Sequence, residues 1–403
     1  MAKGALEGVK VVDFTWAVVG PLTCKYLCDN GATVVKVESM TRIDLSRTLA
    51  PFRDRKAGVN RSGYFSSINS GKYSVTLNLK HSKAIEVAKR LVAWADVVVE
   101  SMRGGAMSEL GLGYEELKKV NPALIMLSTC MYGQTGPHAS HPGYGLILTS
   151  LSGFNHIIGW PDRGPSPIYG PYTDFIAPRF SILAIVAALD YRRRTGKGQY
   201  LDMSQYENGI HFLAPLVLDY VANGREPVRI ANRCPYAAPH GVYRCKGDDR
   251  WCAIAVFSDE EWKSFCQVIG NPDWTKDAKF ATMLARLSNV DGLDKLIEKW
   301  TVGYTAEEVM KLMQLAGVAS AVVATGEDIC NNAQLEHRHF FVEVDHPEIG
   351  RHRIRRQGFI MSETPCEVRR PPLLGEHNEF VYTRLLGMSD EEFVQLHQER
   401  VFE

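Results

Sequence analysis

Val9-Lys-Val-Val-Asp-Phe14 and Thr33-Val-Val-Lys-Val-Glu38 are two short runs rich in β-branched residues, and residues 22–29 between them have the pattern of a helix. β-branched runs bounded by turn residues predict buried strands. The alternation continues outward along the chain, with strands expected at 73–79, 95–100 and 123–128 and helices at 82–94 and 114–120. Strands separated by helices favour parallel pairing with helices on both faces. The sequence therefore predicts an α/β fold with a doubly wound, Rossmann-like sheet.

The composition changes after this alternating part. Residues 133–171 are rich in Gly, Pro, Ser, Thr and aromatic residues, and long irregular segments often carry function. A long helix is expected at 175–194 and a helical stretch at 203–221, before a break at Asn223-Gly224. We therefore expect four parts, namely a large Rossmann-like domain over 1–200, a linker over 201–224, a small α+β domain over 225–325, and a linker and C-terminal part over 326–403.

Charge and cysteine usage narrow the class of protein. Lysine plus arginine and aspartate plus glutamate are balanced at 46 each among 403 residues, so no overall field favours nucleic acid or a membrane surface. The most apolar stretch, 180–189, is too short to cross a membrane, and the first residues lack the pattern of a secretory signal. The nine cysteines form no CxxC pair, which favours buried free thiols, no metal site and a reducing cytoplasm.

Several familiar catalytic signatures are absent from the sequence. No G-x-G-x-x-G follows the first strand, and there is no Walker lysine motif, H-E-x-x-H or G-x-S-x-G. A Rossmann-like half without its glycine fingerprint does not predict a dehydrogenase.

Asp174 is the most informative carboxylate, because it lies where the Gly- and Pro-rich segment meets the long helix. One interpretation is structural, since Asp is a favoured N-cap residue. The other is catalytic, since a carboxylate at a helix N-terminus in a dry pocket can act as a nucleophile. Two other acids have open interpretations. Asp13 is expected to cap the next helix, and Lys36-Val-Glu38 is either a contact for a nucleotide ribose or a solvated charge pair.

The order of several short motifs resembles the class III CoA-transferases, the family of formyl-CoA:oxalate, crotonobetaine–carnitine and benzylsuccinate CoA-transferases. Each motif is weak alone, but seven or more in order make the similarity specific, and it runs over nearly the whole chain. The motifs are Leu6-Glu-Gly-Val-Lys-Val-Val-Asp-Phe14 with Gly20-Pro21, Gly31-Ala-Thr-Val-Val-Lys-Val-Glu38, Ala95-Asp-Val-Val-Val-Glu100, Gly111-Leu-Gly-Tyr-Glu-Glu-Leu117, Gly133-Gln-Thr-Gly-Pro137, Asp174, Arg194-Thr-Gly-Lys-Gly-Gln199 and Pro372-Leu-Leu-Gly-Glu-His377.

The resemblance implies an architecture and a set of partners. The large domain would be built from both chain ends, with the small domain inserted, and two chains would interlock as a homodimer or as a heteromer with a related subunit. Coenzyme A would be a co-substrate, and the other substrates would be an acyl-CoA donor and a carboxylic acid acceptor.

The resemblance also implies roles for individual residues. Asp174 would be the nucleophile that carries an aspartyl-CoA thioester. The backbone amides of Val18 and Val19 are candidates for oxyanion donors by position, and Tyr144 matches a tyrosine near the active site. For coenzyme A, Lys80 falls where relatives contact the nucleotide, with Arg42 and Glu38 as further candidates.

The sequence departs from the family pattern at several positions. Val18 stands where some relatives carry Gln, Ser101 where Asn is common, and Glu109 where a relative has an Arg. Residues 232–239 replace the glycine-rich lid of the oxalate enzymes. These departures argue against formyl-CoA and oxalate as substrates. Aromatic residues near the site favour a larger acid such as benzylsuccinate, with succinyl-CoA as donor; they are Trp16, Phe154, Trp160, Tyr169, Tyr172 and Tyr236.

Two alternatives stay open. An isomerase of the α-methylacyl-CoA racemase type needs two acid–base groups that flank the α-carbon, and racemases carry a histidine near the position of Tyr144. A tyrosine of ordinary pKa is a poor base at neutral pH, which favours the transferase. The chain could also be a non-catalytic subunit of a heteromeric CoA-transferase, although the presence of Asp174 argues against that.

Overall fold

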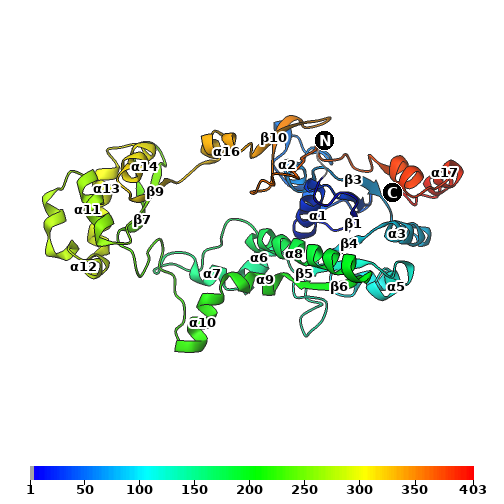
Figure 1. Cartoon of the computed structure of the whole chain (residues 1–403), viewed down its shortest axis with the longest axis horizontal. Helices are drawn as coiled ribbons and strands as arrows, with labels where there is room; N and C mark the ends of the chain where they lie inside the picture. Colours follow the sequence, from blue (N-terminus) through cyan, green and yellow to red (C-terminus); the bar gives the residue numbers. More distant parts are fainter. Residues whose placement is uncertain (1–3) are drawn as a thin grey trace. The chain divides into compact units, whose positions relative to one another are not determined.

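The computed structural model describes residues 4–403, which form two compact units (Figure 1). Unit 1 comprises residues up to 155 together with 167–226 and 336–403, and unit 2 comprises 156–166 and 227–335. Each unit has its own hydrophobic core.

Unit 1 is built on a six-stranded sheet in the order β3-β2-β1-β4-β5-β6, in which every neighbouring pair is parallel. This is the strand order of a doubly wound sheet, so the expected α/β fold with a parallel sheet is confirmed. The strands are β1 (Lys10–Phe14), β2 (Thr33–Glu38), β3 (Tyr73–Thr76), β4 (Val97–Glu100), β5 (Ile125–Cys130) and β6 (Gln199–Ser204).

Successive side chains of each strand point to opposite faces of the sheet, and a hydrophobic core lies on each face. Val11 packs with α1 (Val19–Asp29) and α8 (Tyr172–Thr195) on one face, whereas Val12 faces a second core that contains α3 (Ser82–Trp94). Successive side chains of a strand point to opposite faces, so a run of valines is buried on both sides. This is why continuous apolar runs, rather than alternating ones, mark the central strands.

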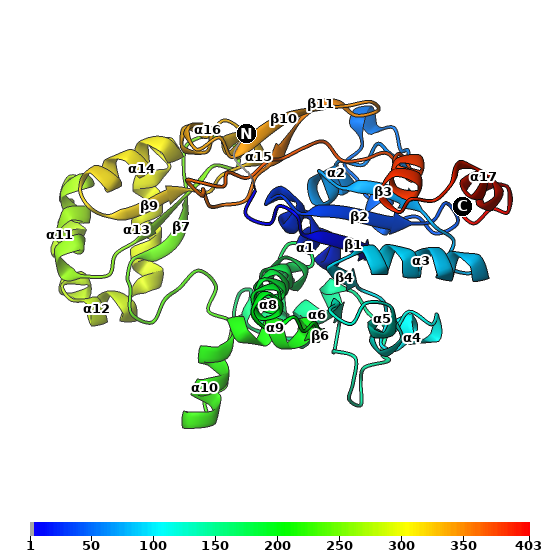
Figure 2. The same cartoon turned by 45° about the vertical axis from the view of Figure 1, so that its right-hand side comes forward.

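The C-terminal segment completes the second of these cores. Tyr382 and Phe402 are buried beside α3, and Arg90 of α3 pairs with Glu392 at 2.8 Å in α17, so α17 lies alongside α3 (Figure 2). The remaining elements of unit 1 are α2 (Gly63–Asn69), α4 (Ala106–Glu109), α5 (Tyr114–Val120), α6 (Gly145–Leu151), α9 (Gln205–Phe212), α10 (Ala214–Asn223), α16 (Ala333–His337, at its border), α17 (Asp390–Gln398), the short helices η1 (Leu45–Thr48), η2 (Arg53–Arg55) and η5 (Phe380–Leu385), and the hairpin β10 (Phe341–His346) with β11 (Gly350–Arg355).

Unit 2 is an α+β unit with its own core. An antiparallel sheet in the order β7-β8-β9 packs against helices around Phe265, Leu293 and Val309, all of which are fully buried. Its elements are α7 (Phe154–Ile157, at its border), β7 (His240–Arg244), β8 (Trp251–Ala255), α11 (Asp259–Val268), η3 (Asp273–Lys276), η4 (Ala278–Phe280), α12 (Met283–Ser288), α13 (Val290–Thr301), α14 (Ala306–Leu315), β9 (Ala319–Val322) and α15 (Gly326–Cys330).

Two sequence-based expectations need correction. Residues 201–224 are not a linker, because they hold most of β6 and the helices α9 and α10 of unit 1. β6 is an edge strand in which only Ser204 is buried, so its sequence lacks the continuous apolar run of the central strands and did not predict a strand. Within the described residues, α8 has the length and hydropathy of a membrane span, although we expected no such stretch. It packs against α1, α6, α9 and β5, as a core helix does.

Candidate active site

Asp174 lies in the first turn of α8, inside the helix rather than at its cap. Pro171 is the N-cap residue, so the interpretation of Asp174 as the N-cap is wrong. The Asp174 side chain is buried, with only 8% of its surface exposed. Its Oδ1 accepts no hydrogen bond from any residue of the described chain, 4–403. Burial therefore raises the pKa of Asp174 to about 7, far above that of an ordinary carboxylate.

Asp174 lines a pocket of about 600 Å³ within unit 1. The pocket opens where the chain leaves β1 at residues 16–19 and β4 at residues 101–103. The strand order reverses between β1 and β4, and ligands of doubly wound sheets bind outside the carboxyl ends of the strands at this point. The other lining residues come from the segments 106–110, 130–131, 139–145 and from Arg42, Leu45 and Gln205.

Gly145, at the start of α6, gives the Asp174 carboxyl group its space. A Cβ at position 145 would overlap Oδ1 and Cγ of Asp174 and the ring of Pro171. The carbonyl of Gly145 in turn accepts from Oγ1 of Thr173 at 3.3 Å and from Oγ1 of Thr149 at 2.8 Å. The two helix starts are therefore packed against each other with no side chain between them.

The N-terminus of α1 faces the same pocket. Val18 is its N-cap residue and Val19 its first residue, and both line the pocket. Within the described range 4–403, no acceptor takes the backbone N–H of Val18 or Val19. Unpaired amides at a helix start favour negative charge, so this end of the pocket can stabilise an anion.

A second, smaller pocket of about 210 Å³ lies beside the first, since both are lined by Trp16, Arg42, Met102 and Leu110. Glu38, the last residue of β2, and Lys80, in the segment that follows β3, also line it. Arg42 stacks on the Trp16 ring, with its guanidinium carbon 3.9 Å from the ring centroid. The two neighbouring pockets, of about 600 and 210 Å³, therefore offer more room than a simple carboxylic acid needs.

Comparison with known proteins decides the family. Residues 6–378 match the family model described as CoA-transferase family III. The chain belongs to CoA-transferase family III. It is therefore an enzyme that acts on CoA thioesters, and the predicted family is confirmed.

Relatives of this transferase match over most of their length. It is 32% identical to the succinyl-CoA–D-citramalate CoA-transferase of Chloroflexus aurantiacus, covering 98% of each chain. It is 34% identical to the acetyl-CoA:oxalate CoA-transferase of Acetobacter aceti, covering 85% of this chain and 86% of that one. A CaiB/BaiF family protein from Brucella suis has a similar crystal structure, with 31% identity, a TM-score of 0.87, and coverage of 96% of this chain and 100% of that one.

The structure brings the predicted site residues of the transferase into two groups. Asp174, Val18, Val19 and Tyr144 line the larger pocket, and Arg42 borders both pockets. Tyr144 is 73% exposed, so it stands at the rim rather than inside. The sequence analysis did not single out Gly145 for a role, because only the packing of α6 on α8 shows why a side chain is excluded there.

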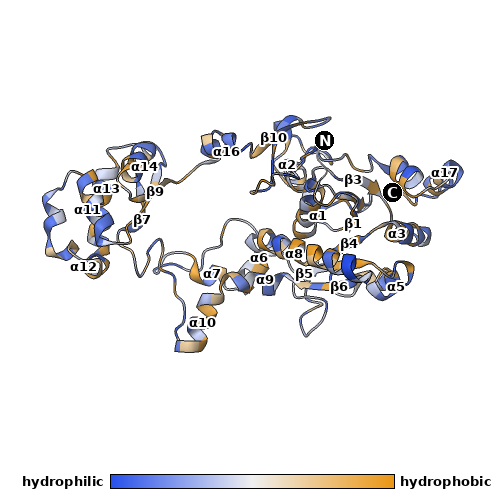
Figure 3. Cartoon of the chain, in the orientation of Figure 1, coloured by the Kyte–Doolittle hydropathy of each residue, from blue (hydrophilic) through white to orange (hydrophobic). Residues whose placement is uncertain are grey.

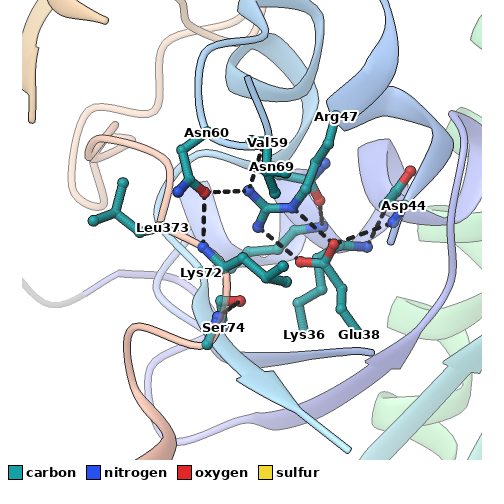
Figure 4. A network of polar contacts seen from close by, with 12 residues as sticks. Lys36, Glu38, Asp44, Arg47, Val59, Asn60, Asn69, Lys72, Ser74 and Leu373 are labelled. Atoms are coloured by element: carbon teal, nitrogen blue, oxygen red, sulfur yellow. Dashed lines mark hydrogen bonds and ion pairs between the residues drawn. The ribbon is translucent and has the colours of Figure 1, made fainter. Parts of the chain in front are cut away.

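Lys36 and Glu38 of the transferase are not a solvated pair, so that interpretation is wrong. Both carboxylate oxygens of Glu38 accept from Arg47, each at 2.8 Å, and Lys36 lies 2.8 Å from Asp44 (Figure 4). Each carboxylate oxygen of Glu38 already accepts one hydrogen bond, so a ribose hydroxyl could bind only through the remaining lone pairs of this carboxylate. Lys36 is fully buried, and although burial lowers the pKa of a lysine, Asp44, Asp13 and Glu38 outweigh it and hold the pKa above its ordinary value.

Asp13 does not cap α1, which corrects a further expectation. Its Oδ2 accepts from Nζ of Lys72 at 2.7 Å, and Lys72 also donates to the carbonyl of Pro21 and to Asn69. Burial raises the pKa of Asp13, but Lys72 and Lys36 more than offset this and hold it below the ordinary value. Three acids and three bases thus form a buried, charge-balanced layer under the two pockets; they are Asp13, Glu38, Asp44, Lys36, Arg47 and Lys72.

Proposed function

We propose that this class III CoA-transferase moves coenzyme A from a CoA thioester, with succinyl-CoA as first candidate, to a dicarboxylic acid through a covalent intermediate on Asp174. The observation that carries the proposal is the Asp174 carboxyl group, which is buried, unpartnered and aimed into the same pocket as the free amides of α1. A carboxylate that neither water nor a hydrogen-bond donor stabilises is a stronger nucleophile than one in water.

The chemistry proceeds in two symmetric halves. The Asp174 carboxylate attacks the thioester carbonyl of the donor, the C–S bond breaks, and CoA departs as a thiolate. The enzyme then carries a mixed anhydride between Asp174 and the donor acid. The thiolate then attacks the aspartyl carbonyl, which releases the donor acid and leaves an aspartyl-CoA thioester. The acceptor carboxylate attacks that thioester and releases the thiolate, which attacks the acceptor acyl carbon and restores Asp174. No water enters the balance, so the thioester free energy is retained.

Two groups of residues support these steps. Each addition to a carbonyl places negative charge on oxygen, and the amides of Val18 and Val19 are placed to donate to it. The smaller pocket, which Lys80 and Arg42 line, suits the phosphates and nucleotide of coenzyme A, because neither cation is paired with a carboxylate within residues 4–403. Glu38 remains a candidate for the ribose.

The names of the relatives guide the choice of acceptor. They name D-citramalate and oxalate, both dicarboxylic acids, with succinyl-CoA and acetyl-CoA as donors. A pocket of about 600 Å³ also admits an aryl-bearing dicarboxylate such as benzylsuccinate. Fewer aromatic residues line the pocket than the sequence predicted, because only Trp16 of the six that suggested such an acid is among its lining residues.

We also propose that the enzyme works with a second chain of this fold. α10 buries none of its residues within the described chain, although it is one of the most apolar helices (Figure 3). Further exposed apolar side chains lie on α6 and α8. We name the α10 face by the exposed apolar residues of α10, which are Val217, Leu218, Tyr220 and Val221; those of α6 and α8 are Leu146, Ile147, Leu183 and Val186. Exposed apolar surface of this kind marks interaction sites. A second copy is the first candidate and a related subunit the second.

The experiment that tests the transfer uses trapping of the covalent intermediate. The enzyme is incubated briefly with succinyl-CoA or another acyl-CoA, treated with hydroxylamine, and mapped by mass spectrometry. We expect a hydroxamate on Asp174 that is absent in Asp174→Ala, together with acyl-CoA formation from added dicarboxylates. An unmodified Asp174 with deuterium exchange at the α-carbon in D₂O would instead establish the racemase-type reaction. Neither signal from the isolated chain would point to a non-catalytic subunit.

A further inference from the structure

In the turn between β1 and α1, residues 15–18, three backbone groups are each held by a side chain. The carbonyl of Thr15 accepts from Nζ of Lys36 at 2.7 Å, and the N–H of Trp16 donates to Oγ of Ser101 at 3.2 Å. The N–H of Ala17 donates to Oδ1 of Asp44 at 3.0 Å. A surface turn would leave such groups to water, so this turn is held in one conformation.

Ala17 needs such support because its backbone is in the left-handed region. Its φ is 63°, which L residues other than glycine rarely adopt, and no glycine is present at this position. Strained backbone of this kind persists only where the surroundings enforce it, and it clusters at active sites. The residues directly after Ala17 are Val18 and Val19, which line the pocket and whose backbone N–H groups have no acceptor within residues 4–403.

Asp44 is the residue that joins this turn to the buried charge layer. Its Oδ1 also accepts from the N–H of Ser46 at 2.8 Å and from Oγ of Ser46 at 2.8 Å, and its Oδ2 lies 2.8 Å from Nζ of Lys36 (Figure 4). Lys36 in turn donates to the Thr15 carbonyl, so the two members of one ion pair bind two backbone groups of the turn, the Ala17 N–H and the Thr15 carbonyl. Asp44 is 2% exposed and Lys36 is fully buried.

We propose that Asp44 is a positioning residue of the transfer reaction, which holds Ala17 in its left-handed conformation and thereby aims the amides of Val18 and Val19 at the reacting carbonyl. The inference rests on the proposed function of those amides as oxyanion donors. A buried ion pair is a costly way to stabilise a fold, since well-packed apolar residues are often as good or better. It does supply a rigid acceptor of fixed position, which donors that act only in the transition state require.

The test compares two identical substitutions in two buried Asp–Lys pairs. Asp44→Asn breaks the pair with Lys36. Asp29→Asn breaks the pair with Lys25 near the C-terminal end of α1, and neither Lys25 nor Asp29 lines either pocket. In Asp44→Asn we expect kcat to fall about 10- to 100-fold with the KM for the acyl-CoA changed less than about 3-fold, because removal of one preorganised oxyanion donor typically costs 10²–10³-fold. Asp29→Asn is expected to keep kcat within about 2-fold at a comparable loss of thermal stability.

Hydrogen–deuterium exchange on the ligand-free enzyme tests the positioning without relying on activity. In peptides that cover residues 15–20, we expect exchange at least about 10-fold faster in Asp44→Asn and unchanged in Asp29→Asn. Should Asp44→Asn fail to fold, Ser101→Ala is the second variant, because it removes the hydrogen bond from the Trp16 N–H without changing a buried charge. We expect it to lower kcat about 2- to 5-fold and to leave KM unchanged.

The outcomes separate the two proposals. Unchanged exchange in Asp44→Asn, equal kcat losses in the two Asn variants, or an effect on KM alone would overturn the positioning role. Faster exchange at residues 15–20 in Asp44→Asn, combined with a wild-type enzyme that forms no Asp174 adduct, would instead support the positioning of the turn by Asp44 and refute the proposed function.

Discussion

The Asp174 carboxyl group combines two properties that oppose each other. In the proposed reaction it must be ionised to attack a thioester, yet burial raises its pKa to about 7, and within residues 4–403 no donor binds its Oδ1. At neutral pH a substantial fraction of the groups is ionised, and each carboxylate is poorly solvated and therefore reactive. Stability is given up at this residue in exchange for nucleophilicity.

The pH profile should show the raised pKa directly. Below about pH 7 Asp174 is protonated and cannot attack, so kcat/KM should fall as the pH decreases, with an apparent pKa near 7 for the free enzyme. The measurement is kcat/KM for the acyl-CoA from about pH 5.5 to 8.5, a range that extends about one and a half units on either side of that pKa.

Glu100 is the control for this profile, because burial raises its pKa to about 7 as well. It accepts from the N–H of Met102 at 2.7 Å and has no place in the proposed reaction. Glu100→Gln should leave the acidic limb in place. If the limb disappears in that variant, it belongs to Glu100 and not to Asp174.

Asp174→Asn should abolish the covalent adduct and stabilise the fold at pH 8. Between about pH 4 and 7 the folded state binds the Asp174 proton and the unfolded chain does not, so this carboxyl group lowers stability progressively as the pH rises through that range. Above pH 7 the variant should exceed wild type by about 2–4 kcal/mol of unfolding free energy. Urea unfolding at pH 8 and pH 4 measures this, and an equal difference at both values would contradict the assignment.

At the scale of elements, the site depends on how closely helix starts approach one another. α6 and α8 meet at Gly145 and Asp174, and α1 begins at the switch point between β1 and β4. The parallel sheet places all of these starts at the carboxyl ends of its strands, which is why residues far apart in the sequence line one pocket.

Gly145→Ala tests the contact between α6 and α8. Alanine normally stabilises a helix relative to glycine, but here its Cβ would displace the Asp174 carboxyl group. We expect kcat to fall about 10- to 100-fold in a folded protein, since displacement of a reacting group by about 1 Å can cost about 100-fold. Gly292→Ala in α13, where a Cβ would meet nothing within 4 Å, is the matched control and should have wild-type activity.

At the scale of the whole molecule, the exposed apolar side chains of the α10 face predict that a second chain covers them. Leu218 is 65% exposed and Val221 75% exposed, on a helix that the described chain leaves uncovered. We expect wild type to run at twice the 45.0 kDa of one chain in light scattering coupled to gel filtration. Leu218→Glu with Val221→Glu should shift it toward the monomer, because a buried unpaired carboxylate is costly.

Lys197→Glu changes charge by a comparable amount in the exposed turn after α8, and should leave the mass of the assembly unchanged. A wild-type enzyme that is monomeric but binds vesicles through α10 would refute the second-chain proposal. A monomer that becomes a larger assembly only with a related subunit would decide for the heteromer.

The sequence by itself determined the sheet, the family and the central carboxylate. Val11, Val34 and Val97 sit in continuous β-branched runs, and such runs are stable only when helices cover both faces, so local pattern and tertiary burial agree. Only the tertiary structure decided that Asp174 is unpartnered, that Gly145 must lack a side chain, and that Lys36 and Asp44 are buried under a strained Ala17. Those properties arise from contacts between segments separated by tens of residues, and neither residue type nor periodicity records which distant group removes water or supplies a donor.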